Sequence, residues 1–351
     1  MSVEVSWFAA LCDDDHEYLG VPDPALRSSW EHCRGIVLAA EEAGFDNVLL
    51  PSGYTLGIDS VAFAAGIAPL VRRMRLLLAV RLGEMWVPQL ARQLATIDQM
   101  LDGRLTVNII SSDLPGQELA SGPRYRRTLE TMHALRTLLR GERVDVDGEF
   151  VSLHLDPPRI RATGPAPFYF GGMSEAAREV AAQAADVFLM WPDTLHGVAD
   201  TLDDLRRRAA GHGRALRFGY RAHVIVRETE AQARAAARRL VSKLDPEVGE
   251  RIRARSLDSG SAGVAAQVAL RDRADDEGYA EPNLWTGIGR ARSGAGAAIV
   301  GDPDQVLAKL HAYRELGIES FILSGYPHRT EADLFARHVL PKLDHAPLRF
   351  R

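Results

Sequence analysis

The sequence predicts an α/β protein built as a single (β/α)8 TIM barrel. Short runs rich in Val, Ile, Leu and Phe alternate with longer stretches of helical spacing, which is typical of parallel strands joined by crossover helices. About eight such runs occur, and this number favours a closed barrel over an open doubly wound sheet. No low-complexity linker divides the chain, so we expect one domain over residues 1–351.

The expected strands share strong apolar character and a length of a few residues. They are Val3 to Ala10, Asn47 to Pro51, Arg75 to Arg81, Leu105 to Ser111, Phe168 to Gly171, Val187 to Trp191, Arg217 to Val226 and Ser320 to Ser324.

The expected helices share a 3.6-residue apolar period. They are Trp30 to Ala43, Val61 to Val71, Pro88 to Leu101, Tyr125 to Leu139, Ser174 to Ala185, Val198 to Ala210, Glu228 to Leu244, Pro303 to Leu316 and Glu331 to Leu343. Several of them end at a glycine suited to a C-cap: Gly44, Gly103, Gly141, Gly211 and Gly317.

Two stretches interrupt this alternation. Residues Asp145 to Pro158 predict a hairpin around the Asp147-Gly148 turn signal. Residues 245–297, after the seventh strand, are rich in Arg, Asp, Gly, Ser and Ala and contain no strand-like run. A connection of this length inside a compact domain is usually functional or disordered, so we interpret it as a mobile lid over the barrel mouth.

The composition favours a small-molecule enzyme. A net charge of −5 gives no electrostatic reason to expect nucleic acid as a partner. The only cysteines, Cys12 and Cys33, provide neither a disulfide framework nor a metal site, which fits a reducing cytoplasm. The sequence has no secretory leader and no apolar stretch of membrane-spanning length, so we expect no membrane partner and a cytoplasmic location.

In this fold, active sites gather at the C-terminal ends of the strands. After the fifth strand, FGGMSEAA places Gly171, Gly172, Met173 and Ser174 before a helix, where exposed N–H groups can hold a phosphate. An ordinary strand-to-helix turn with a serine N-cap explains the same residues.

The seventh strand, GYRAHVIVRET, places Arg221 and His223 on the same face. Buried cationic groups are costly without an anion, so an inward pair suits a phosphate or sulfonate ligand. Pairing with acidic neighbours near the strand end is the alternative.

Two further segments carry candidate residues. LSGYPH presents Tyr326, and His328 as a possible general acid or base, although a turn with satisfied polar groups is an equal alternative. NLWTGIGRARSGAGAA, within the expected lid, offers Arg290 and Arg292 to close over an anion, or else forms a solvated basic loop. The histidines are scattered without a ligand-like cluster, so we expect no metal site.

Taken together, several segments resemble the bacterial luciferase-like flavin monooxygenase superfamily, most closely its FMNH2-dependent alkanesulfonate monooxygenase branch. They include AAEEAGFDNVLLPSG, ARQLATIDQMLDGRLTVNII, FYFGGMSEAAREVAAQAADVFLMW, RFGYRAHVIVRET, EPNLWTGIGRARSGAGAAIVGDP and GIESFILSGYPH. The likeness extends from about residue 5 to residue 344, and RAHVIVRET and NLWTGIGRARSGAG are specific to that branch.

The resemblance implies roles for individual residues. Arg221, His223, Arg292 and Tyr326 match the catalytic cluster that binds the sulfonate and handles protons. Trp191 matches a tryptophan at the substrate end of the flavin pocket, and we expect Tyr54, at the rim after the second strand, and Arg290, in the lid, to bind substrate as well. The FMN-binding group comprises Ser111, Ser112, Tyr125, Gly171, Gly172, Met173 and Ser174.

The resemblance also implies a two-component monooxygenase that uses FMNH2 and O2 to desulfonate an alkanesulfonate or related organosulfonate to an aldehyde and sulfite. Because the chain lacks a nicotinamide fingerprint, a separate NAD(P)H:flavin reductase is the expected partner. A homodimer or homotetramer is expected from the family.

One departure leaves the substrate open. The alkanesulfonate enzymes carry a cysteine after the second strand, whereas this chain has Tyr54 to Gly57 there, and both of its cysteines lie elsewhere in the sequence. The alternative is therefore a flavin N- or C-oxygenase acting on a non-sulfonate substrate in a specialised pathway. A deazaflavin-dependent dehydrogenase and a non-catalytic flavin-binding protein are more distant alternatives.

Overall fold

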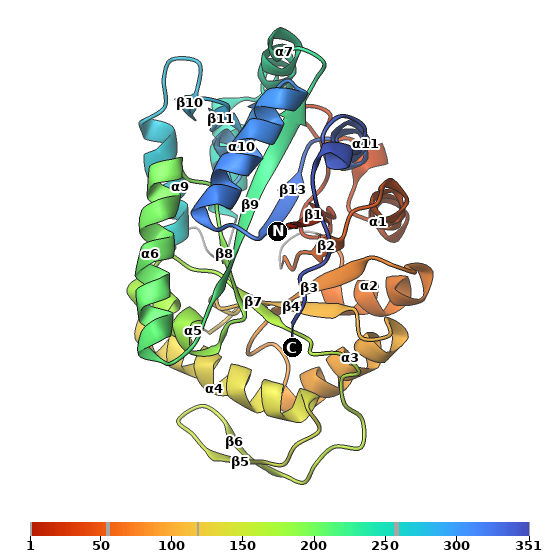
Figure 1. Cartoon of the computed structure of the whole chain (residues 1–351), viewed down its shortest axis with the longest axis vertical. Coiled ribbons are helices and arrows are strands. Elements are labelled where there is room, and N and C mark those ends of the chain that lie inside the picture. Colours follow the sequence, from red (N-terminus) through yellow and green to blue (C-terminus); the bar gives the residue numbers. More distant parts are fainter. Residues whose placement is uncertain (1, 54–56, 118, 256–259, 351) are drawn as a thin grey trace.

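Eight parallel strands close into a barrel, as the sequence predicts. The computed structural model describes residues 2–53, 57–117, 119–255 and 260–350 (Figure 1). The barrel strands, in order around the barrel, are β1 (Glu4–Phe8), β2 (Asn47–Leu50), β3 (Arg75–Arg81), β4 (Leu105–Ile110), β7 (Phe168–Phe170), β8 (Val187–Met190), β9 (Arg217–Val226) and β13 (Ser320–Ser324). Strand β13 pairs with β1 and thereby closes the ring.

A ring of helices covers the outside of the barrel. They are α1 (Trp30–Ala43), α2 (Ser60–Ile67), α3 (Val87–Met100), α4 (Ser121–Leu139), α5 (Glu175–Ala184), α6 (Leu195–Gly211), α7 (Glu230–Leu240), α10 (Pro303–Leu316) and α11 (His328–His338). Gly44 and Gly317 are the expected left-handed caps, with φ of 92° and 115°. The expectation for Gly211 is wrong, because this glycine is the last residue of α6 and His212 is the cap.

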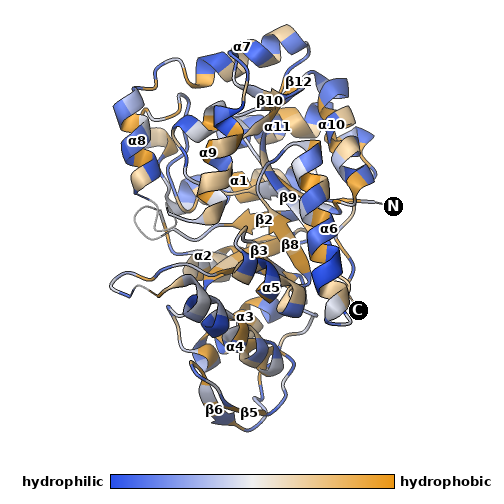
Figure 2. Ribbon diagram, turned by 90° about the vertical axis from the view of Figure 1, so that its left-hand side faces the viewer, coloured by the Kyte–Doolittle hydropathy of each residue, from blue (hydrophilic) through white to orange (hydrophobic). Residues whose placement is uncertain are grey.

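The predicted hairpin is present but has a longer turn. Strands β5 (Val144–Asp147) and β6 (Ser152–Leu155) pair in antiparallel fashion. The Gly148 N–H donates to the Val151 carbonyl at 2.9 Å, so the loop has four residues rather than the two of a tight Asp-Gly turn. The hairpin projects from the end of the molecule opposite to α7 (Figures 1 and 2).

The prediction that residues 245–297 contain no strand is wrong. This segment forms α8 (Pro246–Ala254), α9 (Ala262–Asp272) and a short antiparallel pair, β10 (Tyr279–Glu281) and β11 (Leu284–Trp285). Strand β11 pairs with β12 (Ala298–Gly301), which in turn lies parallel to the C-terminal half of β9. Strands of two or three residues are too short to produce an alternating pattern in the sequence.

Packed side chains fill the barrel at the N-terminal ends of its strands. The buried Glu4 carboxylate accepts hydrogen bonds from the Tyr169 hydroxyl at 2.7 Å and the Ser320 hydroxyl at 3.0 Å. Burial raises the pKa of Glu4, although these hydrogen bonds and Arg75 oppose the shift. Because this end is filled, as is usual for the fold, a functional site is expected at the opposite, C-terminal ends of the strands.

No helix among the described residues has both the length and the apolar character that crossing a bilayer requires.

Asp98 provides a test of how the barrel is held together. Its buried carboxylate accepts from the backbone N–H groups of Leu105 at 3.0 Å, Thr163 at 2.6 Å and Gly164 at 2.9 Å. Asp98→Ala leaves these donors without their acceptor, so we expect the free energy of unfolding in urea to fall by about 3 kcal/mol. The exposed Asp200→Ala on α6 is the control, and equal stability of the two variants would contradict this account.

Candidate functional site

Strand β9 directs Arg221 and His223 into the barrel mouth. Both side chains are buried, with exposed fractions of 3% and 0%. The guanidinium carbon of Arg221 lies 4.4 Å from the centre of the Phe8 ring, and Phe8 belongs to the interior cluster of the barrel. Tyr220, at the alternate position of the strand, packs in the cluster between the sheet and the helices. The predicted division of the two strand faces is therefore confirmed.

Ser324 connects the side chains of Arg221 and His223. The register of β13 against β9 places Ser324 directly beside His223. Arg221 Nη2 donates to the Ser324 hydroxyl oxygen at 2.8 Å, and the same oxygen lies 2.8 Å from His223 Nδ1. Because an arginine only donates, the serine oxygen accepts from Arg221 and its hydrogen can be donated to the imidazole.

Arg292 and Tyr326 complete the cluster from two other segments. Arg292 follows the short helix η3 (Gly287–Arg290), and its Nη1 donates to the Tyr326 hydroxyl at 2.6 Å. The Tyr326 ring stacks on His223 with 5.2 Å between ring centres. The structure thus brings together all four residues of the predicted catalytic cluster, which come from β9, the loop before β12 and the end of β13.

The cluster has an unbalanced positive charge. No carboxylate of the described residues lies within ion-pair distance of Arg221 or Arg292. Burial and the neighbouring Arg292 lower the pKa of Arg221 to about 9. Burial also lowers the pKa of Arg292, but Tyr326, Cys12 and the more distant Asp13 carboxylate outweigh it and hold this pKa above its ordinary value.

Three buried nitrogen atoms face this region without a partner among the described residues. They are Arg292 Nε, His223 Nε2 and His328 Nε2. Buried polar atoms are nearly always hydrogen-bonded, so these unpaired atoms indicate a place for a ligand, and the unpaired Arg292 N–H beside two cations suits an anionic one.

The loop after β1 contributes two residues that the sequence analysis did not assign to the site. Asp15 is fully buried and accepts from His328 Nδ1 at 2.8 Å. Cys12 packs against Gly53 and lies close enough to Arg292 to influence its pKa. Cys12 lies elsewhere in the sequence than the cysteine of the alkanesulfonate enzymes, but the loop after β1 folds back and places it beside the end of β2.

The predicted phosphate loop is open and lies at a helix N-terminus. Ser174 caps α5 by accepting from the Ala177 N–H at 3.2 Å. The backbone N–H groups of Met173 and Ser174 have no acceptor in the described part of the chain. Gly171 is exposed, and a Cβ atom at Gly172 would lie 2.5 Å from the Ala177 side chain. This loop fits a phosphate group.

The other predicted flavin residues border the same loop. The Tyr125 hydroxyl lies 3.4 Å from the position that a Cβ atom at Gly172 would take, and the Tyr125 ring meets Phe170 edge-on. The Ser111 hydroxyl, at the end of β4, accepts from Thr128 at 2.7 Å, and Ser112 donates to the Asp113 carbonyl. Strand β4, helix α4 and the β7–α5 loop thus form one wall of the mouth.

Trp191, the predicted substrate contact, lies beneath the 245–297 segment. A Cβ atom on Gly263 would be 3.0 Å from its indole ring, so the start of α9 packs directly on this tryptophan. Gln267 Nε2 donates to the Pro192 carbonyl at 2.7 Å, and Gln267 Oε1 accepts from the Gly296 N–H at 3.0 Å.

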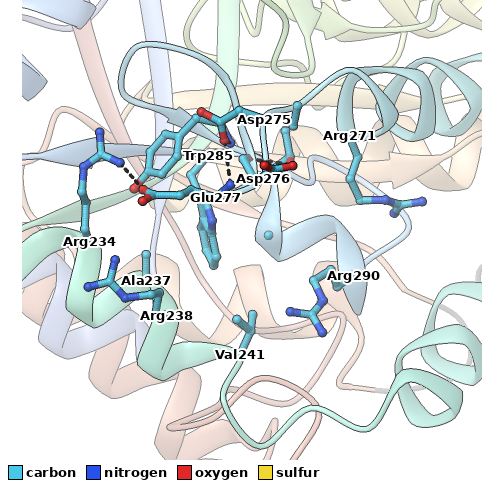
Figure 3. Close-up of a pocket in the computed structure, with 15 residues that line it drawn as sticks. Arg234, Ala237, Arg238, Val241, Arg271, Asp275, Asp276, Glu277, Trp285 and Arg290 are labelled. Carbon is cyan, nitrogen blue, oxygen red and sulfur yellow. Dashed lines mark hydrogen bonds and ion pairs between the residues drawn. The ribbon is translucent and has the colours of Figure 1, made fainter.

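The structure does not place Arg290 with the cluster. This residue is exposed and lines a separate pocket of about 430 Å³ with Arg238, Val241, Trp285 and Glu277 (Figure 3). The remaining predicted contact, Tyr54, lies outside the described residues. Within those residues, no group of three or more His, Cys, Asp or Glu side chains is arranged to hold a metal ion.

Protonated Arg221 should make anion binding depend on pH. Because its pKa is lowered to about 9, Arg221 is charged at neutral pH and loses its proton as the pH rises through this value. We expect the affinity for sulfate, measured by calorimetry, to be constant from pH 7 to 8 and to fall above pH 9. Arg221→Gln should bind more weakly and lose this dependence, whereas a wild-type affinity that is unchanged at pH 10 would contradict the assignment.

Comparisons with known proteins agree with this geometry. The family model for luciferase-like monooxygenases matches residues 3–320. A sulfoquinovose monooxygenase of Novosphingobium aromaticivorans is 63% identical over 354 aligned residues, which cover 98% of each chain. A sulfoquinovose monooxygenase of Agrobacterium fabrum is 52% identical and covers 97% of this chain and 90% of its own.

Two solved structures share the fold at low sequence identity. Long-chain alkane monooxygenase (LadA) has a TM-score of 0.78 and 17% identity, with 100% of this chain and 94% of that chain covered. DmoA from Hyphomicrobium sulfonivorans has a TM-score of 0.77 and 16% identity, with 100% and 90% covered. The matched family model and the two sulfoquinovose monooxygenases show that the chain belongs to the luciferase-like monooxygenase family and is a flavin-dependent monooxygenase.

Proposed function

We propose that this enzyme is the oxygenase of a two-component system that uses FMNH2 and O2 to cleave the carbon–sulfur bond of an organosulfonate. One oxygen atom of O2 enters the aldehyde product, the other leaves as water, and sulfite is released. The observation that carries the proposal is the pair Arg221 and Arg292, which face the barrel mouth without a carboxylate partner among the described residues. Sulfoquinovose, named for both relatives, is the first substrate to test.

In this proposal the sulfonate takes the place of the missing counter-ion. A guanidinium group offers two parallel N–H groups to two oxygens, and such charge-assisted hydrogen bonds are about twice as strong as neutral ones. Burial, followed by Arg221 and Arg292, holds the pKa of His223 well below its ordinary value, so the ring is neutral. With Nδ1 accepting from Ser324, Nε2 carries the hydrogen, which can be donated to a third sulfonate oxygen in place of the nearby Ala295 backbone.

Tyr326 holds a proton beside the sulfonate. Burial raises the pKa of Tyr326 to about 12, although Arg292 opposes the shift, so the phenol stays protonated at neutral pH. Its oxygen accepts from Arg292, and its own hydrogen is free to be donated to the substrate or the departing sulfite. This side chain thus orients the reacting group and can supply a proton where charge develops.

The flavin belongs against the wall formed by β4, α4 and the β7–α5 loop. Residues 171–174 would hold its phosphate, and Tyr125, Ser111 and Ser112 would line its body. When bound in reduced form, the flavin supplies the electrons that activate O2. A separate NAD(P)H:flavin reductase would deliver it, and we propose assembly as a homodimer or homotetramer.

We also propose that residues 245–297 act as the lid of a single-domain enzyme. Helix α9 rests on Trp191, and Arg292 reaches the cluster from the C-terminal end of this segment. Closing the segment would therefore bring an arginine to the anion and exclude water at the same time.

Arg292→Ala and Arg290→Ala form a matched pair for testing the site. Arg292→Ala removes one charged donor from the sulfonate, so we expect kcat/KM to fall on the order of 100-fold. Arg290→Ala, in the same segment but on the exposed pocket, should change it less than about twofold. The measurement is sulfite release from sulfoquinovose with FMN, NADH and a flavin reductase in air.

Wild-type sulfite release that requires every component would support the desulfonating reaction. If the wild-type enzyme binds reduced FMN but releases no sulfite from any sulfonate, the reaction is wrong. A flavin N- or C-oxygenase of a non-sulfonate substrate then becomes the better explanation.

Gly172→Ala tests the phosphate loop. The added methyl group would meet the Ala177 side chain at 2.5 Å and displace the loop, so we expect the Kd for FMN to rise about tenfold. Gly211→Ala at the end of α6, where no atom lies within 4 Å of the new methyl group, is the control. Flavin fluorescence titration measures both variants, and an unchanged Kd in Gly172→Ala would remove this loop from the flavin site.

A further inference from the structure

Asp15 is a buried carboxylate in the loop after β1, and it pairs with the side chains of two histidines, His328 and His32. Its oxygens accept from the backbone N–H of His328 at 2.9 Å, from His328 Nδ1 at 2.8 Å and from His32 Nε2 at 3.1 Å. The backbone N–H of His16 donates at 2.9 Å. No arginine or lysine of the described chain pairs with Asp15. Burial opposes ionisation, but His328 and His32 outweigh it and hold the pKa of Asp15 below its ordinary value.

An ionised Asp15 fixes the hydrogen on one nitrogen of His328. A carboxylate only accepts, so the hydrogen of a neutral His328 ring lies on Nδ1 and Nε2 carries a lone pair. Burial lowers the pKa of His328, and Arg292 and Arg221 lower it further, although Asp15 opposes the shift. The ring is therefore neutral, and Nε2 is an acceptor rather than a donor.

The position of the His328 ring places this acceptor within the cationic cluster. Its centre lies 5.0 Å from that of Tyr326 and 5.7 Å from that of Phe8, the ring over which Arg221 sits. Nε2 is buried and has no donor among the described residues.

A sulfonate group cannot supply the hydrogen-bond donor that His328 Nε2 lacks. Its oxygens only accept, so they pair with Arg221, Arg292 and the Nε2–H of His223 and have nothing to offer a second acceptor. An unpaired buried acceptor costs about 1–3 kcal/mol. The complementary ligand group is one that donates a hydrogen to His328 Nε2, as a hydroxyl does.

We propose that Asp15 is a positioning residue that holds His328 Nε2 as an acceptor for a substrate hydroxyl, so that the enzyme selects hydroxylated sulfonates over simple alkanesulfonates. This inference rests on the proposed sulfonate site and adds a second point of recognition beside it. Asp15 itself acts only through His328.

The test compares two sulfonates of matched size, sulfoquinovose and cyclohexylmethanesulfonate, whose ring lacks hydroxyl groups. Their affinities for the FMN-saturated enzyme are measured by calorimetry. We expect the wild-type enzyme to prefer sulfoquinovose. In Asp15→Asn, an amide N–H can donate to Nδ1 and shift the hydrogen to Nε2, so the affinity for sulfoquinovose should fall about tenfold. The affinity for cyclohexylmethanesulfonate should change less than about twofold.

Two further variants separate recognition from folding. Asp14→Asn alters the neighbouring, partly exposed carboxylate that accepts from the Ser28 N–H at 2.8 Å, and it should leave both affinities unchanged. His328→Phe keeps an aromatic ring against Phe8 and Tyr326 but lacks Nε2, and it should reproduce the selective loss. If Asp15→Asn does not fold, the comparison of the two sulfonates in His328→Phe tests the proposal.

Equal weakening of both sulfonates in these variants would assign Asp15 a purely structural role and overturn the proposal. An unchanged preference in Asp15→Asn or His328→Phe, or a wild-type enzyme that binds both sulfonates equally, would overturn it as well. A wild-type enzyme that shows the Asp15-dependent preference but releases no sulfite would leave this inference standing and remove the desulfonation reaction instead.

Discussion

The site depends on two arginines held over one aromatic ring without a carboxylate to neutralise them. Arg221 and Arg292 lie 4.4 and 5.4 Å from the centre of the Phe8 ring. A contact with the face of an aromatic ring stabilises a cation but does not cancel its charge. The mouth of the barrel therefore keeps a positive charge with no carboxylate at ion-pair distance, and a bound anion would balance it.

The barrel supplies this arrangement through strand register. Strand β9 is ten residues long and extends beyond the end of its neighbour β8. Its C-terminal half is therefore free to pair with β12. That pairing anchors the C-terminal end of the 245–297 segment beside the mouth. The same register sets Ser324 next to His223, and the Ser324 hydroxyl connects this imidazole to Arg221.

The sequence was sufficient to predict those features of the fold that depend on an apolar pattern repeating along the chain. The eight barrel strands and the inward face of Arg221 and His223 followed from alternation and count, because burial imposes a period on each element. The grouping of Arg292 and Tyr326 with them came from resemblance, since no local pattern relates residues that are 34 positions apart.

Contacts that depend on how loops fold back could not be predicted in this way. Nothing in the run of three aspartates before His16 distinguishes Asp15 from its neighbours, although Asp15 is the buried partner of His328. Arg290 and Arg292 have the same chemistry and nearly the same position in the sequence, yet Arg290 lines an exposed pocket (Figure 3). Arg292 instead enters the cluster. Only the turn that follows η3 distinguishes them, and its geometry has no signature in the sequence.

Selenate, a sulfate analogue with an anomalous X-ray signal, would test the central claim directly in a crystal soak. The account predicts a selenium peak in contact with the guanidinium groups of both Arg221 and Arg292. A peak confined to the exposed pocket beside Arg238 and Arg290, or no peak at the barrel mouth, would contradict it.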